Sequence, residues 1–171
     1  MNDEVNQAPG QQAWHVAHVK PRCEKKVAEY CAANHLFCDL PLREETKIYQ
    51  RRKVTVRKPV FPGYCFLRHT PVQRVTLLKS NLIVRLIPVA DQERLASDLE
   101  QIHQALDVDP TLDACAAFKA GKRVVIRSGP FRGLEGVVQV VRAKTRVILN
   151  VEMIGRGLAV EVEMSLLEPA E

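Results

Sequence analysis

The chain of 171 residues is 46% hydrophobic and 26% charged, so it can bury one ordinary core, or a modest core plus a small module. Its 25 Lys and Arg against 20 Asp and Glu give a formal charge of +5, which favours polyanionic partners but excludes a protein that coats nucleic acid. Because no apolar signal segment or membrane-spanning run is visible, we expect a cytoplasmic protein with no membrane partner.

The first part of the chain predicts a mixture of strands and helices. Residues 1–13 have almost no large apolar side chains and are expected to form a disordered tail. Residues 47–56 predict an irregular, basic hairpin arm. Strands are expected where β-branched and aromatic residues gather, over 14–19, 37–42, 60–67 and 82–89. Helices are expected where apolar residues recur every three or four positions, over 23–33, 71–79 and 92–106.

A change of composition predicts two domains. Residues 107–118 carry three Asp, a Pro and small residues without periodicity, which is typical of a linker. From 119 to 171 the chain is rich in Val with frequent turn residues, and so short an all-β segment loses its exposed edges by closing into a barrel. We therefore predict an α+β protein: an antiparallel sheet with helices over 14–106, then a small five-stranded SH3-like β-barrel over 119–171.

Neither the cysteines nor the histidines form a pattern typical of a metal or catalytic site. The five cysteines contain no CxxC pair, so we expect reduced, mostly buried thiols. His15 and His18 lie three residues apart on one predicted strand and would point to opposite faces. Since no nucleophile motif or phosphate loop is present either, we expect no enzymatic activity, no metal and no cofactor.

Two motifs resemble those of one protein family. Residues 129–137 follow a predicted strand, and with Phe131 between two glycines they resemble the KOW module of NusG-type factors. Trp14, the basic residues 51–53 and the block Phe-Pro-Gly-Tyr at 61–64 resemble the NusG N-terminal domain in order and spacing. The resemblance covers residues 14–168, and the chain is identified as a member of the NusG family. It implies a NusG-type α/β sandwich joined by a flexible linker to a KOW barrel.

The resemblance implies a transcription elongation or antitermination factor that works without covalent chemistry. Its N-terminal domain would bind the RNA polymerase clamp and bridge the cleft, which alters pausing or termination. The KOW barrel would recruit a second partner, such as the ribosome or a termination factor. We expect the factor to be a monomer.

The resemblance also assigns contacts with the polymerase. From strand alternation alone, Phe61 and Phe66 could equally be core residues, with only Tyr64 exposed. A second polymerase contact falls on Thr76, although Thr76 could equally be the flank of a helix packed through Val75 and Leu78. The clamp contact falls on four residues, His18, Pro62, Tyr64 and Phe66.

The resemblance also implies contacts with nucleic acid and with the partner of the barrel. Contacts to the non-template DNA strand fall on Lys20, Arg22 and Lys26, which could otherwise form a solvated face. The arm would act as an electrostatic guide to nucleic acid through Arg51, Arg52 and Lys53. The KOW partner contact falls on Phe131, Met153, Ile154 and Arg156.

Two departures from the general family pattern resemble specialised paralogues of the RfaH, UpxY and LoaP kind, which act on selected operons. His15 stands where Tyr is usual, and residues 79–86 replace a Pro-Gly-Val-like block. Val-rich alternation favours a stable barrel over a hidden helical hairpin. The alternative function is that of a ribosome- or RNA-associated KOW protein, which leaves the N-terminal domain unexplained.

Overall fold

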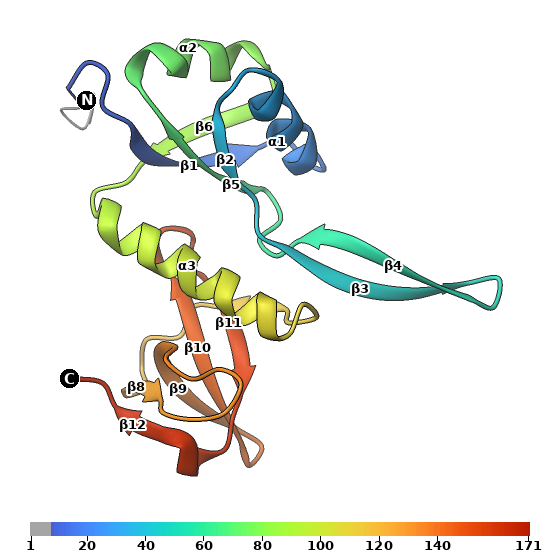
Figure 1. Cartoon of the computed structure of the whole chain (residues 1–171), viewed down its shortest axis with the longest axis vertical. Coiled ribbons are helices and arrows are strands. Elements are labelled where there is room, and N and C mark those ends of the chain that lie inside the picture. Colours follow the sequence, from blue (N-terminus) through green and yellow to red (C-terminus); the bar gives the residue numbers. More distant parts are fainter. Residues whose placement is uncertain (1–7) are drawn as a thin grey trace. The chain divides into compact units, whose positions relative to one another are not determined.

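The computed structural model describes residues 8–171, so residues 1–7 of the expected tail lie outside the described part. The chain divides into two units, each described separately below (Figure 1). One unit contains residues up to 41 together with 61–95, and the other contains 42–60 together with 96–171. Between residues 8 and 171, no helix has the combination of length and apolar character that a membrane crossing requires.

A four-stranded antiparallel sheet forms the first unit, in the order β2-β5-β1-β6. Its strands are β1 (Ala13–Val19), β2 (Phe37–Asp39), β5 (Tyr64–His69) and β6 (Ile83–Pro88). The four predicted strands are therefore confirmed, although β2, β5 and β6 are shorter than expected. β5 begins only at Tyr64 because Pro62 and Gly63 belong to a turn.

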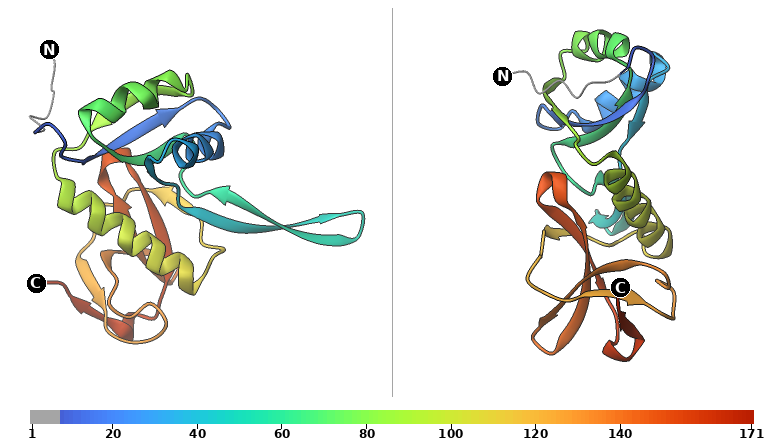
Figure 2. Two further views of the ribbon diagram at one scale, coloured as in Figure 1. Left: turned by 45° about the horizontal axis from the view of Figure 1, so that its top comes forward. Right: turned by 90° about the vertical axis from the view of Figure 1, so that its left-hand side faces the viewer.

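Two helices, α1 (Glu24–Ala33) and α2 (Pro71–Lys79), cover one face of this sheet (Figure 2). The core beneath them contains Val27 and Cys31 from α1, Leu77 from α2, and odd-numbered residues of β1 and β5. α2 starts as predicted, because the Thr70 side chain and Gln73 form a capping box and Pro71 takes the first turn. The even-numbered residues of β1 and β5 consequently lie on the opposite face of the sheet.

The third helix, α3 (Gln92–Val108), begins in the first unit and continues into the second. The Asp91 carboxylate accepts a hydrogen bond from the Arg94 N–H at 2.9 Å and so caps the N-terminus of the helix. The predicted apolar stripe is confirmed, because its four members are buried: Leu95, Leu99, Ile102 and Leu106.

The predicted basic hairpin is confirmed, but it is regular and not irregular as expected. β3 (Leu42–Tyr49) and β4 (Arg52–Pro59) pair in unbroken register from Leu42 opposite Pro59 to Tyr49 opposite Arg52. The two turn residues, Gln50 and Arg51, have φ values of 46° and 65°. Positive φ at both positions is the type I′ turn, whose twist matches that of paired strands. The sequence does not indicate this turn type, because neither residue is the Asn or Gly that usually marks it.

The barrel sheet contains the five expected strands and one more, in the order β12-β8-β9-β10-β11-β7. The sixth strand, β7, comes from the predicted linker and pairs with the start of β11. The Asn150 side chain holds the same stretch by accepting from the Phe118 N–H and donating to the Phe118 carbonyl. The strands are β7 (Ala114–Ala116), β8 (Arg123–Ile126), β9 (Glu135–Val141), β10 (Lys144–Val151), β11 (Arg156–Glu161) and β12 (Leu167–Pro169).

Candidate functional site

The Phe-Pro-Gly-Tyr block forms a tight turn that leads into β5. Pro62 occupies the second position and Gly63, with φ of 89°, occupies the third, the residue types that a type II turn requires there. The turn is closed by the Tyr64 N–H, which donates to the Phe61 carbonyl at 3.2 Å. Such a turn presents its two central residues to solvent, and Pro62 is indeed exposed.

Two further hydrogen bonds fix this turn to its neighbours. The Gly63 N–H donates to the buried Glu24 carboxylate of α1 at 2.8 Å, and the Gly63 carbonyl accepts from the Val19 N–H at 2.9 Å. The second bond is made where the β1–β6 register shifts, between His18 and Val19. The turn is therefore held by α1 and by the inner strand β1, so its shape is set before any partner binds.

Three of the four residues predicted to bind the clamp meet at this turn. His18 and Tyr64 are directly opposite each other across β1 and β5, and their ring centroids lie 5.6 Å apart. His18 and Pro62 are exposed, and Tyr64 is half-buried. We call His18, Pro62, Gly63 and Tyr64 the aromatic turn surface.

The fourth predicted clamp residue, Phe66, is in the core. Its exposed fraction is 0%, that of Phe61 is 2%, and the two rings make an edge-to-face contact at 6.3 Å. The prediction of a direct contact through Phe66 is corrected accordingly. Tyr64 and Phe66 point to the same face of β5, but Tyr64 lies at the strand end while Phe66 lies in the covered middle. Phe66 supports the surface by packing.

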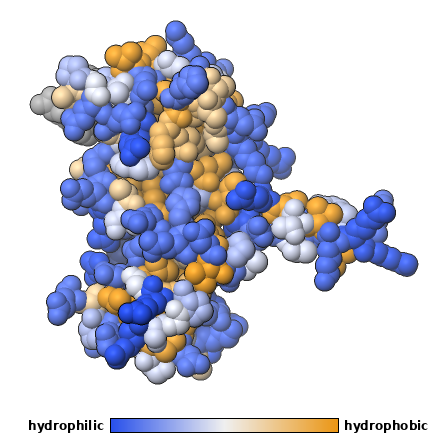
Figure 3. Space-filling model, in the orientation of Figure 1, coloured by the Kyte–Doolittle hydropathy of each residue, from blue (hydrophilic) through white to orange (hydrophobic). Residues whose placement is uncertain are grey.

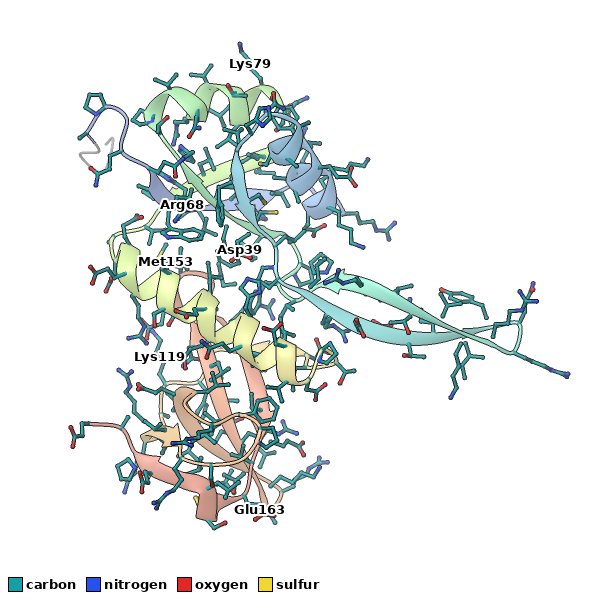
Figure 4. The ribbon with its side chains drawn as sticks, in the orientation of Figure 1. Asp39, Arg68, Lys79, Lys119, Met153 and Glu163 are labelled. Carbon is teal, nitrogen blue, oxygen red and sulfur yellow. The ribbon has the colours of Figure 1, made fainter. Side chains whose placement is uncertain are left out.

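Sequence reasoning missed a second aromatic group on the same sheet face. The Arg68 guanidinium lies 4.6 Å from the ring centroid of Phe37 and 5.6 Å from that of Trp14. Arg68 is opposite both residues in the strand register, and Phe37 is 41% exposed. Figure 4 labels Arg68 together with Asp39 of the neighbouring strand β2. Because the three side chains come from three strands, no local sequence signal could reveal the group.

The second predicted polymerase contact lies on α2. Thr76 is half-buried, and its carbonyl accepts from the Tyr30 hydroxyl of α1 at 2.7 Å. The alternative of a helix packed through Val75 and Leu78 is wrong, because α2 packs through Leu77. An apolar stripe is instead exposed along α2, where Figure 3 shows hydrophobic side chains at the top of the view. It consists of Val72, Val75 and Leu78, with exposed fractions of 79%, 57% and 47%.

The basic residues predicted to contact nucleic acid lie in two places. Lys20, Arg22 and Lys26 are on the connection from β1 to α1 and on α1 itself; Arg22 and Lys26 are exposed, while the Lys20 ammonium donates to the Asn81 side chain. The other three, Arg51, Arg52 and Lys53, are exposed at the turn end of the hairpin arm. Residues 43–58 hold seven basic and two acidic residues, whereas the rest of the chain holds eighteen of each. The excess charge therefore lies in the arm.

The predicted partner contacts of the barrel lie in two connections. Phe131 is half-buried in the β8–β9 turn, where Gly129 and Gly133 have positive φ values. Met153 and Ile154 are half-buried in the short helical turn between β10 and β11. Arg156 is exposed at the start of β11.

The histidines and cysteines form no metal site within residues 8–171: no group of three or more His, Cys, Asp or Glu there could hold an ion. His15 is buried on the opposite strand face from His18, as predicted, and stacks on His69 with centroids 4.3 Å apart. Burial lowers the pKa of both imidazoles, that of His69 to about 4. All five cysteines are free thiols, of which Cys31 and Cys65 are buried.

The chain is similar to known proteins over most of its length. The family model described as transcription termination factor nusG matches residues 12–102. The transcription termination/antitermination proteins NusG of Staphylococcus carnosus (strain TM300) and Staphylococcus aureus (strain Mu50 / ATCC 700699) are 26% and 27% identical. Each alignment covers 98% of this chain and 99% of the relative.

A solved structure shares the fold. It concerns domain interaction in Thermotoga maritima NusG, and it aligns with a TM-score of 0.52 and 21% sequence identity. The alignment covers 94% of this chain and 98% of that one. The likeness extends across both the sheet-and-helix domain and the barrel.

Proposed function

The chain belongs to the NusG family, and from that premise we propose that it is a transcription elongation or antitermination factor that binds RNA polymerase. Its relatives are named as termination/antitermination proteins. The observation that carries the proposal is the aromatic turn surface, because it holds the exposed His18 and the half-buried Tyr64 at the surface in a fixed shape.

The aromatic turn surface is suited to binding the polymerase clamp. Aromatic side chains contribute most of the binding energy at many interfaces, and a preformed site loses little conformational entropy on binding. Three hydrogen bonds fix the turn before binding, and Phe66 packs in the core of the same strand. Tyr64 is accordingly the residue whose removal weakens the complex most.

A second contact through α2 would allow the domain to bridge two parts of the polymerase. α2 packs on one face of the sheet through Leu77, whereas Tyr64 belongs to the other face. The exposed stripe Val72, Val75 and Leu78 flanks Thr76 and could bury apolar surface against a partner. Contacts on opposite faces of one sheet would hold two polymerase elements at a fixed separation, which is how a bridge across the cleft alters pausing or termination.

Nucleic acid is the proposed partner of the basic residues. The exposed arm carries the excess positive charge, so it would attract DNA or RNA near the polymerase by charge and without reading sequence. Arg22 and Lys26 are exposed and lie two residues to either side of Glu24, whose carboxylate binds the Gly63 N–H, and from there they could reach a non-template strand. The barrel would recruit a second partner through Phe131, Met153, Ile154 and Arg156.

We also propose that the chain is a specialised paralogue that acts on selected operons, and this proposal rests on residues 79–86. The other departure, His15, is buried against His69, so it is a difference in core packing and not in a contact surface.

Transcription of a template with a defined pause and terminator tests the proposed function. Adding the chain should change the fraction of paused or terminated transcripts, and Tyr64→Ala should reduce that change. A chain that binds structured RNA but leaves transcription unaltered would instead support the RNA-associated alternative.

A further inference from the structure

One acidic side chain lies among the cations of the hairpin arm. The Glu45 carboxylate is 2.8 Å from the Lys58 ammonium, 3.1 Å from the Arg43 guanidinium and 3.8 Å from the Lys47 ammonium. A second carboxylate, that of Asp113, lies 3.4 Å from the Arg43 guanidinium. Three cations from two strands thus converge on Glu45.

The register of the hairpin explains this convergence. Arg43 is opposite Lys58, Glu45 is opposite Val56, and Lys47 is opposite Val54, so these alternate positions share one face of the arm. We call this side the Glu45 face. It also includes Tyr49 and Arg52, which are opposite each other next to the turn. The other face carries Glu44, Lys53 and Arg57 together with Thr46 and Thr55.

The arrangement around Glu45 is that of a site for a singly charged oxyanion. Arg and Lys donate charge-assisted hydrogen bonds equally well to a carboxylate and to a phosphodiester, each of which carries one negative charge. The Lys58 ammonium lowers the pKa of Glu45, and Glu45 in turn raises the pKa of Lys58. Because these side chains are solvent-accessible, water and ions can replace the ion pairs readily.

We propose that Glu45 competes with nucleic-acid phosphate for Arg43, Lys47 and Lys58, and so limits the affinity of the arm for nucleic acid. The inference rests on the proposed nucleic-acid contact of the arm and identifies the phosphate-binding cations of that contact. When a phosphate binds, Glu45 gives up its three partners and becomes hydrated. Binding then releases fewer counterions from the nucleic acid than seven free basic residues would release, because three of the seven already pair with a carboxylate.

The neighbouring glutamate provides a matched control. Glu45→Gln and Glu44→Gln change the net charge equally and are adjacent in the same strand, but Glu44 is on the opposite face. Removing the Glu45 charge frees three cations for phosphate, so it should tighten binding to a DNA duplex by about tenfold at low salt. The slope of the logarithm of the binding constant against the logarithm of the salt concentration should steepen by roughly one to two released ions. Glu44→Gln should tighten binding much less.

The experiment is fluorescence anisotropy of the full chain with a labelled random-sequence DNA duplex over a series of salt concentrations. Wild type, Glu45→Gln, Glu44→Gln and the double variant Glu45→Gln with Lys58→Met are compared. We expect Glu45→Gln to bind most tightly and the added Lys58→Met to remove part of the gain, because Lys58 is one of the three freed cations. Equal gains from Glu45→Gln and Glu44→Gln would overturn it, because net charge alone would then explain the effect.

A further variant separates this inference from the proposed contact of the arm tip. If Arg51→Ala with Arg52→Ala leaves binding unchanged while Glu45→Gln still tightens it, the tip contact is wrong and the competition by Glu45 holds. If the tip variant weakens binding but Glu45→Gln behaves like Glu44→Gln, the tip contact holds and the competition is refuted.

Discussion

Acidification from neutral pH to about pH 4 should destabilise the sheet that carries the aromatic turn surface, because two neutral imidazoles are stacked within it. His69 is 1% exposed and His15 is 7% exposed. Each ring is next to a backbone carbonyl, Thr70 for His69 and Ala13 for His15, and a carbonyl can only accept. The Nδ1 atoms therefore carry the hydrogens. Burial and the charge of Arg74 oppose a second proton on both rings, and for His69 the neighbouring His15 does so as well.

The sign and size of the effect follow from the pKa of His69. Burial lowers this pKa from 6.5 to about 4, so between these values the unfolded chain binds a proton that the folded chain excludes. The stability that the neutral His69 contributes is complete above the unfolded pKa of 6.5, and this contribution is lost as the pH falls towards about 4. At 1.36 kcal/mol for each pH unit, His69 alone lowers the free energy of unfolding by about 2 kcal/mol at about pH 5, and by about 3 kcal/mol once it is fully protonated. His15 adds to the loss in the same direction.

Urea denaturation followed by tryptophan fluorescence measures this loss, because the one tryptophan, Trp14, lies in the same sheet. The free energy of unfolding should fall by at least about 2 kcal/mol between neutral pH and about pH 5. His69→Gln should remove most of that fall. His18→Gln removes an exposed imidazole from β1, the strand that also carries His15, but leaves the buried pair in place, so this variant should retain the fall. Equal stability of the wild type at the two pH values would refute the reasoning.

Two further predictions concern the supports of the contact surfaces. Gly63→Ala should destabilise the first unit by about 1–2 kcal/mol, because an L side chain disfavours a φ of 89°, even though the added methyl group would meet His18 only at ordinary contact distance. Urea denaturation checks the value, and an unchanged midpoint would contradict the turn geometry. Tyr30→Phe should cost about 1 kcal/mol by leaving the Thr76 carbonyl without its bond from α1. Differential scanning calorimetry checks this, and a melting temperature that does not fall in Tyr30→Phe would count against the bond.

Much of the fold could be predicted because local patterns specify it. The stripe from Leu95 to Leu106 and the cap at Asp91 define α3 within one stretch of sequence. In the same way, Thr70 and Pro71 mark the start of α2. The positive φ of Gly129 and Gly133 was predictable because glycine between two Val-rich strands indicates a turn.

Features that depend on pairing between distant strands could not be predicted. Whether Tyr64 or Phe66 is exposed depends on how far along β5 the covered part of the sheet extends, and alternation does not give that boundary. β7 lies within the predicted linker, because three small residues carry no strand signal until β11 lies beside them. The stacking of His15 on His69 likewise appears only once β1 and β5 are aligned.

The most direct test of the account is the association of the purified chain with a reconstituted RNA polymerase elongation complex. Wild type is compared with Tyr64→Ala, and with Met164→Ala as a control that removes an exposed apolar side chain from the barrel unit. The account predicts that Tyr64→Ala weakens association at least about tenfold, in keeping with an aromatic hot spot, while Met164→Ala binds like wild type. If Tyr64→Ala binds as tightly as wild type, the aromatic turn surface is not the polymerase contact.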